Sequence, residues 1–204
     1  MKINKKKFLY LISPNKISKN FYKNLIDVLK TNKISFFQLR LKKDSYKKKI
    51  KIAEKIKKIC KKFKVTFLIN DDPKLAKQVN ADGCHLGQKD MDINNAKKLL
   101  FKKVIGVTCH NSIRLAKIAL KNNAHYIAFG AFNSSKTKKV RYKANIEIIK
   151  KLKKISKIPV VAIGGINNLN YKKLLLNKAD FLAISGYIWN NKKIKPFEAI
   201  EKLK

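Results

Sequence analysis

Two aspartates, Asp71 and Asp90, each follow a strand-like segment in a chain with 50 basic and only 12 acidic residues. Acidic side chains that are this scarce, at the ends of consecutive strands, predict a site for a cation. An upstream segment ends in Gln38, Arg40 and Lys42, which alternate along the chain and therefore share one face of an extended strand. Because these polar side chains could contact an anion held by the cation, the simplest predicted ligand is a polyphosphate with Mg²⁺.

A competing interpretation of Asp71 and Asp90 is structural. Aspartate is a preferred N-cap, so each could cap the helix that follows it. Taken singly, capping is the commoner role. Two such aspartates opposite a Gln-x-Arg-x-Lys segment instead favour metal binding, and we expect their side chains to point toward each other.

The composition predicts one domain over residues 1–204 with a substantial core, since 45% of the residues are hydrophobic. A net charge of +38 would attract nucleic acid or anionic membranes. However, the lysines are scattered through every helix-like segment, as on solvated helix faces, and no aromatic residues interleave a basic stripe. We therefore attribute the charge to biased composition and keep a basic nucleic-acid-binding barrel without catalysis as the non-enzymatic alternative.

The cysteines Cys60, Cys84 and Cys109 form neither a disulfide framework nor a CxxC zinc pattern, and we expect them to pack as small apolar residues. No stretch approaches the roughly 20 apolar residues of a membrane span. A reducing cytoplasm is the predicted location. The predicted partners are small-molecule substrates, with no specific nucleic acid and no membrane, and no oligomeric state is predicted.

Short apolar runs alternate with amphipathic, lysine-rich segments, which is typical of repeated βα units. The predicted strands are residues 8–12, 35–41, 66–70, 83–86, 104–108, 126–130, 160–163 and 181–184. The predicted helices are residues 20–30, 45–63, 73–79, 113–122, 146–155 and 169–177, with a last helix that begins at Pro196. Short strands that are buried on both sides, each followed by a helix, predict an α/β fold, a single (β/α)₈ TIM barrel, with an open doubly wound sheet as the alternative.

Both architectures place ligands at the carboxyl ends of the strands, where polar residues recur in this chain. The third strand ends in Asn70, and the fifth ends in Thr108. A polar loop over residues 133–141 follows the sixth strand, and glycine-bearing or serine-bearing turns with Gly165 and Ser185 follow the last two. Backbone N–H groups in such late turns bind a phosphomonoester in barrels, so the rim is predicted to hold two anion sites.

The histidines differ in predicted role. His85 lies inside a strand, where a hydrogen-bonded core histidine is the commoner case. His125 precedes a strand and is expected to be structural. His110 follows the fifth strand on the rim, where a catalytic and a structural role are equally well supported.

Seven segments of the chain together resemble the thiamine-phosphate synthase family. They are, in family order, residues 38–42 (Gln-Leu-Arg-Leu-Lys), 69–71 (Ile-Asn-Asp), 81–90, 106–110 (Gly-Val-Thr-Cys-His), 135–138 (Ser-Lys-Thr-Lys), 162–166 (Ala-Ile-Gly-Gly-Ile) and 184–185 (Ile-Ser). The resemblance implies a barrel that joins an aminopyrimidine methyl diphosphate to a thiazole phosphate. It also implies release of pyrophosphate, thiamine monophosphate as the product, and Mg²⁺ as the cofactor.

The resemblance also implies a role for each matching residue. The pyrimidine diphosphate would be bound by Gln38, Leu39, Arg40, Leu41, Lys42, Asn70, Thr108 and Lys138. The thiazole phosphate would be bound by Ser135, Lys136, Thr137, Gly165, Ile184 and Ser185. Asp71 and Asp90 would hold Mg²⁺, and the catalytic groups would be Arg40, Lys42, Thr108 and Lys138.

The chain departs from the family pattern at a few positions. Leu41 stands where the family usually has glutamate, which bears on the positioning of Arg40 and Lys42. Thr108 replaces the usual serine and keeps the hydroxyl. A related branch isomerises a thiazole carboxylate phosphate, typically lacks the metal aspartates and has a catalytic histidine where this chain has His110, so tautomerase activity is the enzymatic alternative.

The predicted mechanism is dissociative. Pyrophosphate leaves first, the pyrimidine methyl cation is stabilised by its own amino group, and the thiazole nitrogen then captures it. No general base is needed, because the attacking nitrogen carries no proton. This agrees with the lack of a convincing acid/base pair in the sequence.

Overall fold

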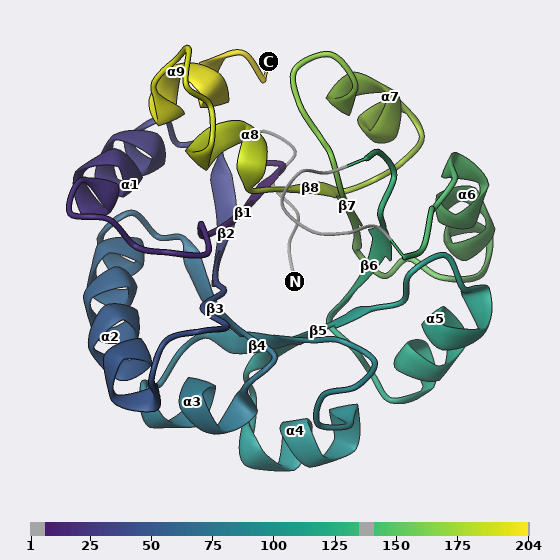
Figure 1. Cartoon of the computed structure of the whole chain (residues 1–204). Helices are drawn as coiled ribbons and strands as arrows, with labels where there is room; N and C mark the ends of the chain where they lie inside the picture. Colours follow the sequence, from purple (N-terminus) through teal and green to yellow (C-terminus); the bar gives the residue numbers. More distant parts are fainter. Residues whose placement is uncertain (1–6, 135–140, 204) are drawn as a thin grey trace.

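The computed structural model describes residues 7–134 and 141–203. Over these residues eight parallel strands pair in chain order, and β8 pairs with β1, so the sheet closes into a (β/α)₈ barrel (Figure 1). The strands are β1 (Leu9–Ile12), β2 (Ile34–Leu39), β3 (Thr66–Asn70), β4 (Gly83–Leu86), β5 (Val104–Thr108), β6 (Tyr126–Gly130), β7 (Val160–Ile163) and β8 (Phe181–Ile184). The predicted barrel is therefore confirmed, and the open sheet is wrong.

Helices surround the barrel as an outer ring (Figure 1). They are α1 (Phe21–Lys30), α2 (Tyr46–Lys62), α3 (Pro73–Gln78), α4 (Ile93–Leu99), α5 (Ile113–Lys121), α6 (Ile146–Ile155), α7 (Tyr171–Leu176), α8 (Gly186–Trp189) and α9 (Pro196–Glu201). Pro73 and Pro196 occupy first-turn positions, as predicted, because proline lacks the N–H that would go unpaired there. The sequence missed α4 and α8, which are short and bury few side chains.

The last six strands have their predicted bounds, but β2 ends two residues early, at Leu39. The reason is that the backbone N–H of Arg40 donates to the side-chain Oγ of Ser13 at 2.9 Å instead of to a neighbouring strand. Arg40 and Lys42 therefore lie in the loop after β2 and are not strand residues.

Alternating strand residues build two apolar layers, as expected for a buried parallel barrel. On β2, Phe36 points into the barrel and Phe37 packs between sheet and helices. The layer inside the barrel consists of Tyr10, Ile12, Phe36, Leu68, Tyr126, Ala128, Val161, Phe181 and Ala183. Cys60, Cys84 and Cys109 are buried and unpaired in the outer layer, which confirms their predicted packing.

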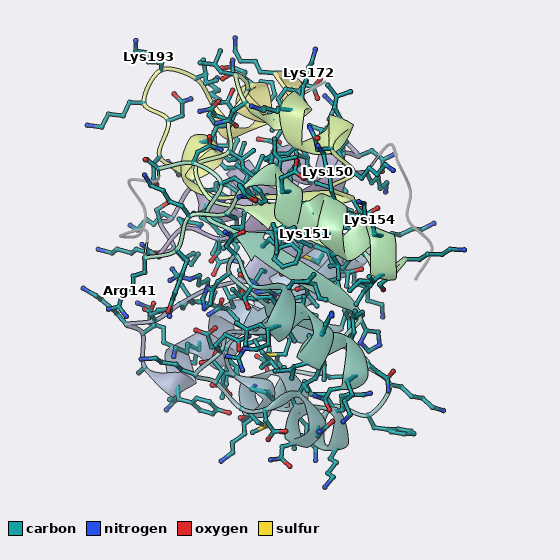
Figure 2. The ribbon with its side chains drawn as sticks, turned by 90° about the vertical axis from the view of Figure 1, so that its right-hand side faces the viewer. Arg141, Lys150, Lys151, Lys154, Lys172 and Lys193 are labelled. Carbon is teal, nitrogen blue, oxygen red and sulfur yellow. The ribbon has the colours of Figure 1, made fainter. Side chains whose placement is uncertain are left out.

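Each helix buries one stripe and exposes its lysines. In α2, Ala53, Ile56 and Cys60 face the sheet at helical spacing, and Ser45 caps the first turn. Figure 2 shows basic side chains projecting outward at the top, at the bottom and on both sides of the view, with Lys150 and Lys154 labelled on α6. This spread is what solvated helix faces predict. Among the described residues, no helix is both long and apolar enough to cross a membrane.

Candidate active site

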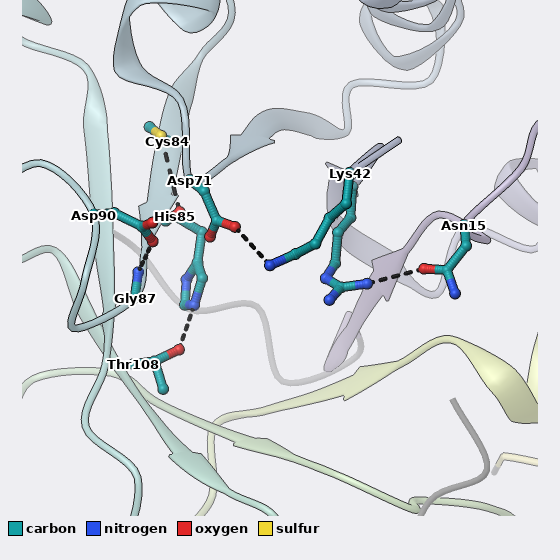
Figure 3. Close-up of polar contacts among 9 residues, drawn as sticks. Asn15, Lys42, Asp71, Cys84, His85, Gly87, Asp90 and Thr108 are labelled. Carbon is teal, nitrogen blue, oxygen red and sulfur yellow. Dashed lines mark hydrogen bonds and ion pairs between the residues drawn. The ribbon is translucent and has the colours of Figure 1, made fainter. Parts of the chain in front are cut away.

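Asp71 and Asp90 lie together at the barrel mouth (Figure 3). Asp71 directly follows β3 with a φ of 64°, a conformation that aspartate tolerates better than most residues. Its backbone N–H donates to the carbonyl of His85 at 2.8 Å, which extends the β3–β4 pairing by one residue. The two carboxyl side chains share a hydrogen bond, and Lys42 Nζ lies 3.2 Å from Asp71 Oδ2.

The position of Asp90 differs from the prediction that it closes a strand. Strand β4 ends at Leu86, so Asp90 lies four residues farther on, in a turn. Its Oδ2 accepts a hydrogen bond from the backbone N–H of Gly87 at 2.7 Å, and this bond aims the carboxyl toward Asp71. A Cβ at Gly87 would lie 2.9 Å from the same oxygen, so glycine gives the carboxylate room to approach the backbone.

The helix-capping interpretation of Asp71 and Asp90 is wrong, because their neighbours are the caps. Asp72 Oδ1 accepts from the N–H of Leu75 at 2.9 Å and caps α3. Asp92 accepts from two N–H groups in the first turn of α4. Asp72 and Asp92 thus cap the two helices, and the side chains of Asp71 and Asp90 remain available at the barrel mouth.

The electrostatics of the carboxyl pair show mutual repulsion. Burial raises the pKa of Asp90, and the contact with Asp71 raises it further. Burial acts in the same direction on Asp71, but the hydrogen bond from Asp90 and the charge of Lys42 outweigh it and lower the Asp71 pKa. The two carboxyl groups therefore disfavour being charged at the same time, and a cation between them would relieve the repulsion.

These two carboxylates fit Mg²⁺ as a ligand set. Among the residues that the structure describes, no group of three or more His, Cys, Asp or Glu could hold a metal ion. Mg²⁺ does not need such a group, because it commonly uses one or two carboxylates and completes its octahedron with water and substrate phosphates. Asn70, at the end of β3, hydrogen-bonds Asp71 and helps to fix its orientation.

Lys42 approaches this pair from the loop after β2, which also carries Arg40. Arg40 Nη1 donates to Asn15 Oδ1 at 2.9 Å, and Lys42 points toward Asp71 (Figure 3). Between them, Leu41 is buried, as is Leu39, and both side chains pack in the layer between sheet and helices. These two leucines therefore offer little side-chain surface to a ligand. Leu41 instead anchors the loop from which the two cations extend.

A cavity of about 480 Å³ opens beside the carboxyl pair. It is lined by Leu41, Lys42, Lys49, Asn70, Asp71, Asp72, Pro73, Lys74 and Met91. Lys49 and Lys74 were not predicted as site residues, because nothing in the sequence distinguishes them from the other lysines of α2 and α3. Together with Lys42 they make this cavity a cationic pocket next to a carboxylate pair.

The opposite edge of the mouth is built from backbone. After β7, Gly164 and Gly165 have φ values of 105° and 59°, which side chains rarely adopt. A Cβ at Gly165 would lie 2.2 Å from the carbonyl of Ser134. Ser185 follows the adjacent strand β8 and precedes α8, and its Oγ donates to the carbonyl of Ser13 at 3.2 Å.

The remaining predicted residues of this edge lie elsewhere or outside the described part. Ile184, the last residue of β8, is buried in the layer between sheet and helices. The predictions for Ser135, Lys136, Thr137 and Lys138 lie outside the described residues.

His85 is a hydrogen-bonded core histidine, as predicted. Its Nδ1 lies 2.8 Å from the hydroxyl of Tyr126, and its Nε2 lies 2.7 Å from Oγ1 of Thr108 (Figure 3). Burial lowers the pKa of His85 to about 4, so the ring is neutral at pH 7. The sequence did not reveal that this histidine contacts a predicted site residue, because no local spacing relates His85 to Thr108.

The other histidines have different surroundings. His125 Nδ1 accepts from the N–H of Ile105 at 3.1 Å, which confirms its structural role. His110 has a φ of 52°, and its ring stacks on Tyr142 with ring centroids 4.1 Å apart. The stack places His110 at the rim beside the end of β6, where its carbonyl accepts from the N–H of Gly130.

Comparison with known proteins gives consistent results. The family model described as thiamine monophosphate synthase matches residues 9–188. A thiamine-phosphate synthase of Pelagibacter ubique is 67% identical over 100% of both chains. One of Erythrobacter litoralis is 39% identical and covers 89% of this chain and 88% of its own. The solved thiamine phosphate pyrophosphorylase of Pyrococcus furiosus superposes with a TM-score of 0.85 at 27% identity, over 98% of this chain and 94% of that one.

Proposed function

This chain belongs to the thiamine monophosphate synthase family, and we propose that it is a transferase that condenses an aminopyrimidine methyl diphosphate with a thiazole phosphate. The products are thiamine monophosphate and pyrophosphate, and the proposed cofactor is Mg²⁺. The observation that carries this proposal is the Asp71–Asp90 pair, with Lys42 beside it, at the edge of a cationic cavity. A reducing cytoplasm remains the predicted location of a chain whose three cysteines are unpaired.

In the proposed reaction the bond between the pyrimidine methylene carbon and the diphosphate oxygen breaks first. Its electron pair leaves with pyrophosphate, and the remaining cation is stabilised by the amino group of the pyrimidine. The side chains of Arg40 and Lys42 neutralise the negative charge that grows on the leaving group, the kind of stabilisation that often dominates such catalysis. Asp71 and Asp90 would hold Mg²⁺, which would supply further positive charge at the leaving group. Lys138, outside the described residues, is assigned the same task by family resemblance.

The second substrate is proposed to bind across the mouth. Backbone N–H groups at Gly165 and Ser185 hold its phosphate, which keeps the thiazole nitrogen near the cation. That nitrogen forms the new C–N bond with its lone pair. No proton has to be removed, so the absence of a general base in the proposed roles is consistent with the reaction.

Incubation of the purified protein with both precursors tests the function, with mass detection of thiamine monophosphate and pyrophosphate. We expect product with Mg²⁺ and very little after treatment with a chelator. Product formed equally well without a divalent cation would contradict the metal role. Isomerisation of a thiazole carboxylate phosphate, without condensation, would support the tautomerase alternative instead.

A further inference from the structure

A chain of hydrogen bonds crosses the inside of the barrel and ends at the mouth. Gln38 Nε2 lies 2.9 Å from the hydroxyl of Tyr10, which lies 2.8 Å from the hydroxyl of Tyr126. The chain continues through His85 to Oγ1 of Thr108, over distances of 2.8 and 2.7 Å. The first four of these residues are at most 8% exposed, so their polar groups depend on one another for hydrogen bonds.

The donor and acceptor atoms at the Gln38 end determine in which direction these hydrogen bonds run. An amide nitrogen only donates, so the hydroxyl of Tyr10 accepts from Gln38. Tyr10 then donates its single proton to Tyr126, and Tyr126 donates its own to Nδ1 of His85. A neutral imidazole with an accepting Nδ1 carries its proton on Nε2, and this proton goes to Oγ1 of Thr108.

The reverse direction leaves a buried donor without an acceptor. If Tyr126 donated to Tyr10, the hydroxyl of Tyr10 would accept from both of its partners in the described chain, Gln38 and Tyr126. Its own proton would then face no acceptor in an interior where Tyr10 is 2% exposed, which is costly. The forward direction gives the hydroxyl protons of Tyr10 and Tyr126 one acceptor each.

We propose that this directed chain makes His85 a positioning residue, which fixes Thr108 with its hydroxyl proton turned toward the substrate in the mouth. Because Oγ1 already accepts from His85, the proton of Thr108 is available to an acceptor atom of the pyrimidine diphosphate. In the reverse direction that proton would be bound to Nε2 of His85 and could not reach a ligand. The inference rests on the proposed function, in which Thr108 contacts that substrate.

The direct test is the tautomer of His85 in the ligand-free protein at pH 7, measured by ¹⁵N NMR of histidine-labelled protein. The spectrum of a His85→Gln variant assigns the signals. We expect a proton on Nε2, and a proton on Nδ1 would overturn the inference. This measurement needs no turnover, so it fails or succeeds independently of the proposed function, which would fail separately if the wild-type protein made no thiamine monophosphate.

Tyr10→Phe removes the hydroxyl that transmits the direction. We expect the His85 signal to become a mixture of tautomers and the KM for the pyrimidine diphosphate to rise about tenfold, with the KM for the thiazole phosphate unchanged. Tyr171→Phe is the matched control, because this buried tyrosine lies in the outer layer, and we expect neither change. An unchanged tautomer and an unchanged KM in folded Tyr10→Phe would overturn the proposal.

A double-mutant cycle separates positioning from a general loss of stability. Thr108→Val removes the hydroxyl that the chain is proposed to aim, and we expect it to raise the same KM about tenfold. In the Thr108→Val background, Tyr10→Phe should then have no further effect on KM. Additive effects of the two substitutions on KM would mean that Tyr10 acts independently of Thr108, and the proposal would be wrong.

Discussion

The two edges of the barrel mouth differ in composition, since charged side chains form one edge and backbone forms the other. At the ends of β2 to β4, charged side chains project from loops and are aimed by hydrogen bonds, as Asp90 is by the N–H of Gly87. At the ends of β7 and β8, glycine backbone forms the edge, and Gly165 has no space for a Cβ. The first edge should thus be sensitive to loss of charge at constant shape, and the second to added volume at constant charge.

The largest expected effect is at the charged edge. Asp71→Asn and Asp90→Asn keep the side-chain shape and remove a charge, and asparagine tolerates the φ of 64° at position 71. We expect kcat/KM to fall by about 100-fold or more in each variant, on the scale found when a group that stabilises transition-state charge is removed. Steady-state kinetics at saturating Mg²⁺ measures this.

Asp92→Ala is the matched control for Asp90→Asn, because Asp92 lies two residues away and caps α4. Loss of a cap should lower the free energy of unfolding by about 1 kcal/mol and leave kcat/KM unchanged. Near-normal kinetics in both Asp71→Asn and Asp90→Asn would show that the carboxyl pair does not hold a catalytic cation.

The next expected effect is a pH dependence of stability that comes from His85, which is buried below the charged edge. Burial holds the pKa of His85 at about 4, below the ordinary value of 6.5. Between these two pH values the unfolded chain therefore binds a proton at His85, and the folded protein does not. The contribution of neutral His85 to the free energy of unfolding is fully present above pH 6.5 and is lost as the pH falls toward 4. Between pH 7 and 5 we expect a loss of about 2 kcal/mol in the free energy of unfolding.

Denaturant unfolding at both pH values measures this loss, and His85→Gln provides the comparison. The variant should be less stable at pH 7 because its hydrogen bonds are disturbed, but it should lack the His85 part of the pH slope. Equal slopes in the two proteins would mean that His85 is not buried in its neutral form.

The backbone edge is expected to respond to volume. Gly165→Ala places a Cβ 2.2 Å from the carbonyl of Ser134 at a φ of 59°. We expect the KM for the thiazole phosphate to rise about tenfold and stability to fall by about 1–2 kcal/mol, the cost of a left-handed conformation for a residue with a side chain. The KM for the pyrimidine diphosphate should change little.

Ser185→Ala sharpens this contrast, since it changes a side chain at the same edge and leaves the backbone N–H in place. If the phosphate is held by backbone, the KM for the thiazole phosphate should stay within about threefold of normal. A tenfold rise in Ser185→Ala would instead assign phosphate binding to the hydroxyl, and the two edges would then use the same principle.

The sequence predicted the barrel well, because short apolar strands and amphipathic helices leave clear periodic patterns. Strands β3 to β8 were placed to the residue. Prediction was poorer where tertiary contacts override local pattern. Strand β2 ends early because Ser13, far away in the sequence, takes the N–H of Arg40, and helix α4 was missed because it buries little beyond Ala96.

For the site, the scarcity of acid pointed correctly to Asp71 and Asp90 as neighbours at the mouth. The sequence could not tell which aspartate of each close pair caps a helix, because that depends on where the strand ends and the turn begins. It also could not find contacts between distant segments, such as Asn15 with Arg40. Lys49 and Lys74 gave no signal, since lysine fills every helix of this chain.

Those two lysines provide the smallest and final test of the charged edge. Lys49 and Lys74 line the cavity beside Asp71, but they are partly or fully exposed, so solvent and salt screen their charge. We expect Lys49→Gln and Lys74→Gln each to raise the KM for the pyrimidine diphosphate about two- to threefold at low salt, with kcat unchanged. The effect should shrink at high salt.

Lys151→Gln, on the exposed side of α6, removes the same charge away from the cavity and should have no effect. An equal effect from Lys151→Gln would mean that the overall charge of the molecule attracts the diphosphate, whereas a response confined to Lys49 and Lys74 would extend the charged edge into the cavity.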